Sequence, residues 1–150
     1  MYPKNHLILG AVFAILLHLF FPQINILYIV IMFFSSVLID ADHFLYYAIA
    51  KKDFSLINAY RWYTIRMKKF CSLPKEQRKK IHSGIFIFHG IEILAIMLLL
   101  GIYVSQFFFF IFLGLSFHML LDIPDEIIKK GTLHKLSLIY SIISYQKLRE

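Results

Sequence analysis

Four long runs of apolar residues dominate this chain and restrict what it can fold into. They cover residues 7–21, 24–39, 85–104 and 107–121, and only short polar links separate the first pair and the last pair. Such runs predict helices that cross a lipid bilayer, because a helix satisfies its own backbone hydrogen bonds where water is absent. Apolar residues make up 59% of the sequence, above the roughly 45 to 50% of soluble domains. We therefore expect an all-α fold, an integral membrane four-helix bundle.

The limits of the spans follow from these runs. We expect a single membrane domain over residues 1–150, with spans at about 6–22, 24–46, 82–104 and 107–123. Three of the apolar runs are shorter than the ~20 residues that a span usually needs, so they must tilt, extend or thin the bilayer. The basic residues of 75–80 are predicted to form the first turns of the third helix, after the break at Pro74.

The distribution of lysine and arginine predicts the topology. Ten of the sixteen basic residues lie in 51–80 and five follow Asp125, whereas the links at 22–23 and 105–106 carry none. The positive-inside rule then places both termini and the central loop on the cytoplasmic side of a prokaryotic inner membrane. Attraction to anionic lipid explains the net charge of +7 more simply than nucleic-acid binding does.

Two amphipathic segments are expected to lie along the membrane surface. In residues 53–72, aromatic and aliphatic residues alternate with basic ones, which favours a helix in the headgroup region. In residues 132–148, apolar residues recur at helical spacing after Gly131. The fold class therefore includes amphipathic interfacial helices, and membrane lipid is the expected partner. The sequence does not indicate an oligomeric state.

Histidine and aspartate residues gather near the ends of the predicted helices that face the cytoplasm. Odd helices run outward and even helices run inward, so positions far apart in the sequence become neighbours in a bundle. The candidate metal ligands are His6, Asp40, His43, His82, His89, His118 and Asp122. With Asp42, eight such residues fall near one membrane face, and chance does not account for this clustering. Ionisable groups inside a membrane are also costly.

Helical spacing pairs some of these residues. His118 and Asp122 are four apart, so an imidazole and a carboxylate share one face. His82 and His89 are two turns apart, with Glu92 within the same broad arc. His89 is favoured over His82 as a ligand because it lies inside the apolar run.

The Asp-Ala-Asp-His stretch at 40–43 leaves one role open. Asp40 and His43 share a face, whereas Asp42 points nearly the other way on an unbroken helix. Asp42 either hydrogen-bonds a ligating histidine, or the helix loosens there and delivers both carboxylates. Asp42 and Glu92 are the candidate catalytic bases, with His6 as a further alternative.

Imidazole and carboxylate ligands without thiolate suit a divalent metal. Cys71 is the only cysteine, which excludes an internal disulfide and a thiolate cage. Zinc is the favoured ion, with manganese or iron as alternatives, and the number of candidate ligands allows for two ions. His18 lies twelve residues beyond His6, roughly 18 Å along a helix, and is therefore left out.

Several motifs resemble a known family. They are Asn-His-Leu-Ile-Leu-Gly at 5–10, Asp-Ala-Asp-His at 40–43, His82 with His89, and Phe-His-Met-Leu-Leu-Asp at 117–122. In this order they resemble the family of membrane-bound metal-dependent hydrolases typified by YdjM. The resemblance implies a small helical inner-membrane protein that binds metal through these residues and has hydrolase activity.

Three functions are compatible with this pattern. The leading hypothesis is a metal-dependent hydrolase that acts on a membrane-associated ester or phosphoester, including anionic phospholipid, with nearby basic residues orienting the substrate. The second is a noncatalytic, metal-stabilised membrane scaffold that recruits a partner. The third is an ion transporter, which ranks lowest because transporter sites usually lie near the bilayer midplane among broken helices.

Overall fold

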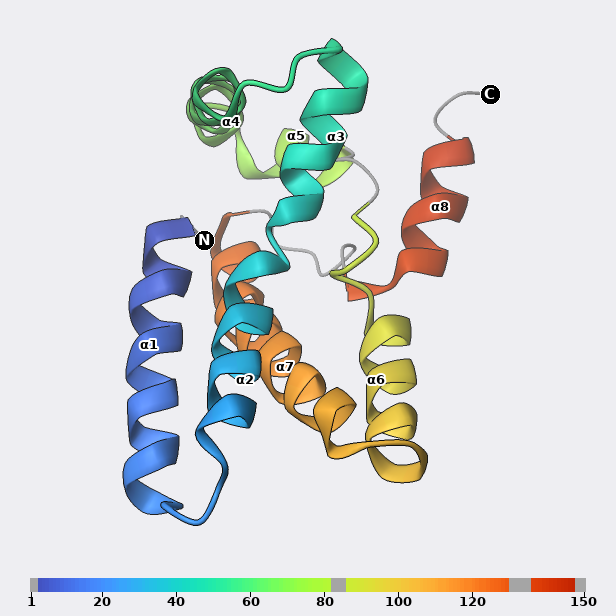
Figure 1. The fold of residues 1–150 in the computed structure, drawn as a ribbon. Helices are drawn as coiled ribbons and strands as arrows, with labels where there is room; N and C mark the ends of the chain where they lie inside the picture. The colour runs from blue at the N-terminus through green and yellow to red at the C-terminus, as the bar shows by residue number, and fades with distance from the viewer. Residues whose placement is uncertain (1–2, 82–85, 130–135, 148–150) are drawn as a thin grey trace. The chain divides into compact units, whose positions relative to one another are not determined.

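The computed structural model describes residues 3–81, 86–129 and 136–147, and these residues form helices without any strand (Figure 1). The prediction of an all-α chain is confirmed. The helices, in chain order, are α1 (Pro3–Phe20), α2 (Ile26–Leu38), α3 (Ala41–Lys51), α4 (Leu56–Cys71), α5 (Lys75–Lys80), α6 (Ile91–Tyr103), α7 (Gln106–Lys129) and α8 (Leu138–Lys147).

Within the described residues, two stretches have the length and apolar character of a membrane span. They are Ile26–Lys51 and Gln106–Lys129. Two further apolar helices, Lys4–Phe20 and Ile91–Tyr103, are shorter. At 1.5 Å per residue, the 13 residues of α6 extend about 20 Å, less than the ~30 Å of a bilayer core. Four membrane spans therefore remain a prediction.

The chain divides into two compact units. The first unit contains Met1–Asp40 and Ile91–Ile123, and the second contains Ala41–Gly90 and Pro124–Glu150. The first unit thus holds α1, α2, α6 and most of α7, whereas the second holds α3, α4, α5 and α8. The boundary at Asp40 coincides with the turn that separates α2 from α3.

Small residues and stacked rings hold the first unit together. A Cβ atom added at Gly114 would lie 2.3 Å from the Met32 carbonyl oxygen, so α7 and α2 approach closely there. A Cβ atom added at Gly10 would lie 2.7 Å from the Ser36 hydroxyl oxygen, so α1 also approaches α2 closely. Close approach of this kind is a common way to pack helices that have lipid as their solvent. The rings of Phe13 and Phe117 stack at 4.2 Å between centroids.

In the second unit, α4 packs against α3. Ser55 caps the start of α4 by accepting a hydrogen bond from the Asn58 amide, as is typical of helix N-termini. Trp62 lies against Tyr47, with 5.7 Å between ring centroids, and the Tyr63 hydroxyl donates a 2.8 Å hydrogen bond to the His43 carbonyl oxygen. These contacts position His43 on α3.

One prediction about helix limits is wrong. Residues 75–80 form the separate helix α5, and the next described helix, α6, begins at Ile91, so His89 lies in a turn before it. Helix α7 continues through Pro124 to Lys129, beyond the predicted span limit at about 123. Proline costs a single backbone hydrogen bond, and its φ angle is compatible with a helix. The pair between Lys129 and Asp125, at 2.7 Å, supports the last turn.

Candidate metal centre

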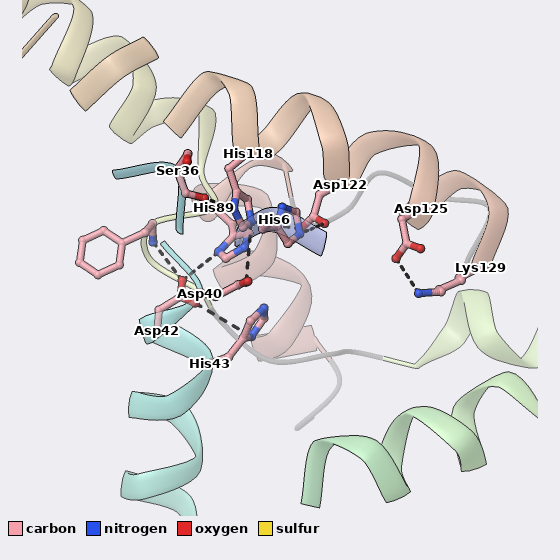
Figure 2. Close-up of polar contacts among 11 residues, drawn as sticks. His6, Ser36, Asp40, Asp42, His43, His89, His118, Asp122, Asp125 and Lys129 are labelled. Atoms are coloured by element: carbon pink, nitrogen blue, oxygen red, sulfur yellow. Dashed lines mark hydrogen bonds and ion pairs between the residues drawn. The ribbon is translucent and has the colours of Figure 1, made fainter. Parts of the chain in front are cut away.

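The orientation of His118 on α7 is determined by the end of α2. Its Nδ1 atom lies 2.8 Å from the Ser36 carbonyl oxygen (Figure 2). The last four carbonyl groups of a helix have no partner within the helix, and Ser36 is one of these in α2. Because a carbonyl oxygen can only accept, Nδ1 must carry the proton, and in the neutral ring Nε2 then carries the lone pair.

Two carboxylates face this Nε2 atom. Asp122 Oδ2 lies 3.5 Å from it and Asp40 Oδ1 lies 3.6 Å from it. Asp122 is four residues after His118 on α7, which brings the two side chains to one face. A lone pair that faces two carboxylates is unfavourable unless a proton or a metal cation lies among them. The arrangement therefore has the charge balance of a cation site.

His6 completes the group from α1. Its ring stacks on that of His118 with 3.8 Å between centroids, and its Nε2 atom lies 3.1 Å from Asp122 Oδ1. Both imidazoles are buried, with 1% and 0% of their surface exposed. Among the described residues, His6 Nδ1 has no hydrogen-bond partner although it is buried. A buried nitrogen left without a partner is costly, and a metal ion is one way to remove that cost.

The donor atoms of His6, His118 and Asp122 lie within 4.8 Å of one another. Two imidazoles and one carboxylate form the ligand set of many catalytic zinc sites, in which a fourth position stays open. The same set is also compatible with manganese and iron. The residues present therefore fit a divalent metal ion, and we call these three residues, together with Asp40, the first-unit group.

A second arrangement of the same chemistry lies within the second unit. Asp42 Oδ2 lies 3.0 Å from His89 Nδ1 and accepts a 3.2 Å hydrogen bond from the Phe88 amide (Figure 2). The ring of His43 is 5.0 Å from that of His89. An ionised carboxylate that accepts the Nδ1 proton leaves Nε2 as the ligating nitrogen, a pairing common around metal ions. We call Asp42, His43 and His89 the second-unit group.

A family model matches residues 1–132, which is most of the chain, and it describes the YdjM inner membrane protein family. The chain belongs to the YdjM inner membrane protein family. The resemblance inferred from the sequence motifs is thus confirmed, and so is the location of the protein in a membrane. Searches of curated proteins and of solved structures each gave no match.

The structure assembles most of the predicted site residues of this YdjM-family chain. His6, Asp40, His118 and Asp122 lie together in the first unit, and Asp42, His43 and His89 lie together in the second unit. His82 lies outside the described residues. Glu92 lies in the first turn of α6 and is not among the described residues whose donor atoms converge.

The arrangement of two predicted ligands differs from the sequence expectation. His89 was expected on the third helix, yet it lies in a turn, because the Phe88 amide donates to Asp42 instead of to a helical carbonyl. Asp40 lies in the turn of residues 39–40 after α2, whereas Asp42 lies in the first turn of α3. Asp42 contacts His89, which corresponds to the alternative in which Asp42 hydrogen-bonds a histidine.

The role of Ser36 could not be inferred from its residue type. The carbonyl oxygen that binds His118 belongs to the backbone, and any residue would supply it. The useful signal was its position one turn before Asp40, near the end of an apolar run, where helix carbonyls lose their partners.

Proposed function

We propose that this protein is a membrane-bound, metal-dependent hydrolase that acts on a membrane-associated ester or phosphoester. The observation that carries the proposal is the hydrogen bond from His118 Nδ1 to the Ser36 carbonyl oxygen, at 2.8 Å. This bond fixes the proton on Nδ1 and turns Nε2 toward the carboxylates of Asp40 and Asp122. Such orientation of a ligating imidazole is a recurrent feature of metal sites.

The metal would be held by His6, His118 and Asp122, with Asp40 as a further carboxylate beside them. Zinc is favoured and manganese or iron are the alternatives. When bound, the ion would act as a Lewis acid and would make water nucleophilic near neutral pH. The side chains of Asp40 and Asp122 are 16% and 21% exposed, so the carboxylate side of the group is the side that a substrate would approach.

The second-unit group would hold a second metal ion or position the substrate. Asp42 accepts hydrogen bonds from the Phe88 amide and faces His89 Nδ1, which assigns it a positioning role in this proposal. Glu92 is then the preferred candidate for the general base, since its carboxylate opens α6 in the same unit as the first-unit group. Removing a general base typically costs about 10²- to 10⁴-fold in rate.

We further propose that both termini and the segment from Lys51 to Lys80 lie in the cytoplasm. The support is the positive-inside rule, because ten basic residues lie in that segment while the link at 22–23 carries none. A reporter enzyme that is active only in the periplasm, fused after Glu150, should remain inactive. The same reporter inserted in the 22–23 link should be active, and the opposite pattern would reverse the topology.

The experiment that tests the hydrolase uses the full chain in detergent, loaded with zinc or manganese, and mixed micelles of anionic phospholipid or a chromogenic phosphodiester. Wild type should turn over at least one of these substrates, and Asp122→Asn should lose both metal and turnover. Asp125→Asn is the matched control, because Asp125 lies on the same helix but pairs with Lys129. Glu92→Gln should keep its metal and lose turnover.

A metal-stabilised scaffold is the second candidate, and the burial of the imidazoles favours it. His6 and His118 are almost completely buried, as ligands of structural metal sites often are. In that case metal would raise the thermal stability of wild type, but no ester or phosphoester would be hydrolysed. Metal-loaded protein that is folded and inactive on every substrate tested would replace the hydrolase with this candidate.

A further inference from the structure

Helix α4 has one face that is already occupied. Ala59 is buried, the ring of Trp62 packs against Tyr47, and the Tyr63 hydroxyl donates to the His43 carbonyl oxygen. These three positions are spaced at three and four residues, so they form one side of the helix. Contacts with α3 thus fix which way α4 is turned within the second unit.

The rest of the α4 surface is exposed and carries two kinds of residue. Leu56, Tyr60 and Met67 form an apolar stripe next to Tyr63, on the flank of the occupied face, and Leu56 and Tyr60 are 69% and 61% exposed. Arg61 and Lys68, seven residues apart and both exposed, form a basic stripe on the side of the helix opposite Ala59. We call the apolar and basic stripes together the outer face of α4.

The position of α4 along the chain keeps it close to one membrane surface. It begins five residues after Lys51, the end of the candidate span Ile26–Lys51, and five residues extend at most about 18 Å. Figure 1 draws α4 nearly end-on where α3 is seen from the side, so α4 crosses α3 steeply. Given that α3 forms the end of a membrane span, a helix that crosses it steeply would lie along the membrane surface.

We propose that the outer face of α4 binds the anionic headgroups of the membrane in which the chain is embedded. The apolar stripe would lie at the boundary between headgroups and acyl chains, and Arg61 and Lys68 would contact phosphate oxygens. Residues 51–80 contain ten basic and two acidic residues, so the charge of the segment complements an anionic leaflet. Nucleic acid would use the basic stripe but would leave the exposed apolar stripe in water.

Cys71 offers a direct probe of this surface. It is the only cysteine, it is exposed, and it is the last residue of α4. A spin label on Cys71 of the full chain in nanodiscs reports mobility and accessibility to oxygen, which dissolves in lipid. With anionic phosphatidylglycerol present, we expect an immobilised, oxygen-accessible label. With zwitterionic lipid alone, the mobile component should grow.

The charge-reversed variant Arg61→Glu/Lys68→Glu should release α4 in anionic nanodiscs. Each basic residue near an anionic surface contributes about fivefold to binding, so the ratio of immobile to mobile label should fall about 25-fold or more. The matched control is Lys4→Glu/Lys75→Glu, which changes the net charge equally at exposed positions outside α4. It should retain the wild-type spectrum.

Three results with the spin label alone would overturn the proposal. They are a label that stays mobile in anionic nanodiscs, equal spectra with and without anionic lipid, and equal loss in the variant and its control. If the variant fails to fold, wild type in high salt replaces it. Because salt screens the attraction to anionic headgroups, high salt must then make the label mobile in anionic nanodiscs. If an added oligonucleotide changes the spectrum of the label while lipid composition does not, the basic stripe binds nucleic acid instead of lipid. None of these readouts depends on metal or on hydrolysis.

Discussion

Replacing Gly114 with alanine tests whether close packing of α7 on α2 supports the first-unit group. The added Cβ atom would lie 2.3 Å from the Met32 carbonyl oxygen and 3.0 Å from the Ser36 amide nitrogen, where ordinary contact begins at 3.4 Å. Both atoms belong to the backbone of α2, so the helices must separate by about 1 Å. Overpacking of this kind costs about 1 to 3 kcal/mol.

The same separation would stretch the hydrogen bond between His118 and Ser36. Its length of 2.8 Å would increase to about 3.8 Å, beyond the range of a hydrogen bond, and this would cost a further ~0.5 to 1.5 kcal/mol. We therefore expect Gly114→Ala to lower the free energy of unfolding by about 2 to 4 kcal/mol. It should also weaken metal binding, because His118 would lose its orientation.

The assay is an unfolding titration with denaturing detergent, monitored by circular dichroism. The metal content of each variant is measured as well. Gly10→Ala is the matched control, because the nearest atom to its Cβ would be the Ser36 hydroxyl oxygen, which can rotate away at the cost of one hydrogen bond. Its loss of stability should be about 1 kcal/mol. Gly114→Ala with the stability and the metal content of wild type would refute the reasoning.

Two further predictions concern the second unit. Asp42→Ala should lower the free energy of unfolding by about 2 to 4 kcal/mol, because the Phe88 amide and His89 Nδ1 would both lose their buried acceptor; an unchanged thermal midpoint would contradict this. Hydrogen bonds, chiefly from Tyr47, hold the pKa of Asp53 below its usual 3.8. The stabilisation from Asp53 is therefore present above about pH 4 and is lost as the pH falls through the lowered pKa. We expect this loss at low pH to appear as a change in tryptophan fluorescence. Asp53→Asn should remove the change, and its persistence in the variant would exclude Asp53 as its source.

The apolar runs predicted most of the helical structure because burial in lipid requires it. The run at 7–21 lies almost wholly within α1, and the run at 107–121 lies within α7. The start of the third helix could not be predicted in this way. Phe86 and Phe88 continue the apolar pattern, but the Phe88 amide is bound by Asp42, 46 residues away, and periodicity carries no information about such a contact.

The candidate site was predictable where it depends on local spacing. His118 and Asp122 meet because they are four residues apart on one helix. The expected direction of the helices placed His6 near His118, but the stacking of their rings could not be predicted from it. The division of the ligands between two units was not predictable, because it depends on a turn at Asp40 that interrupts an otherwise helical and apolar stretch.

The metal content of the purified chain tests the central claim most directly. Wild type in detergent, incubated with zinc, manganese or iron and then desalted, should retain about one equivalent of metal in the first-unit group. His118→Ala should lose this equivalent, and His18→Ala, which removes an exposed histidine from α1, should retain it. Folded wild-type protein that remains free of metal after incubation with all three ions would contradict the account.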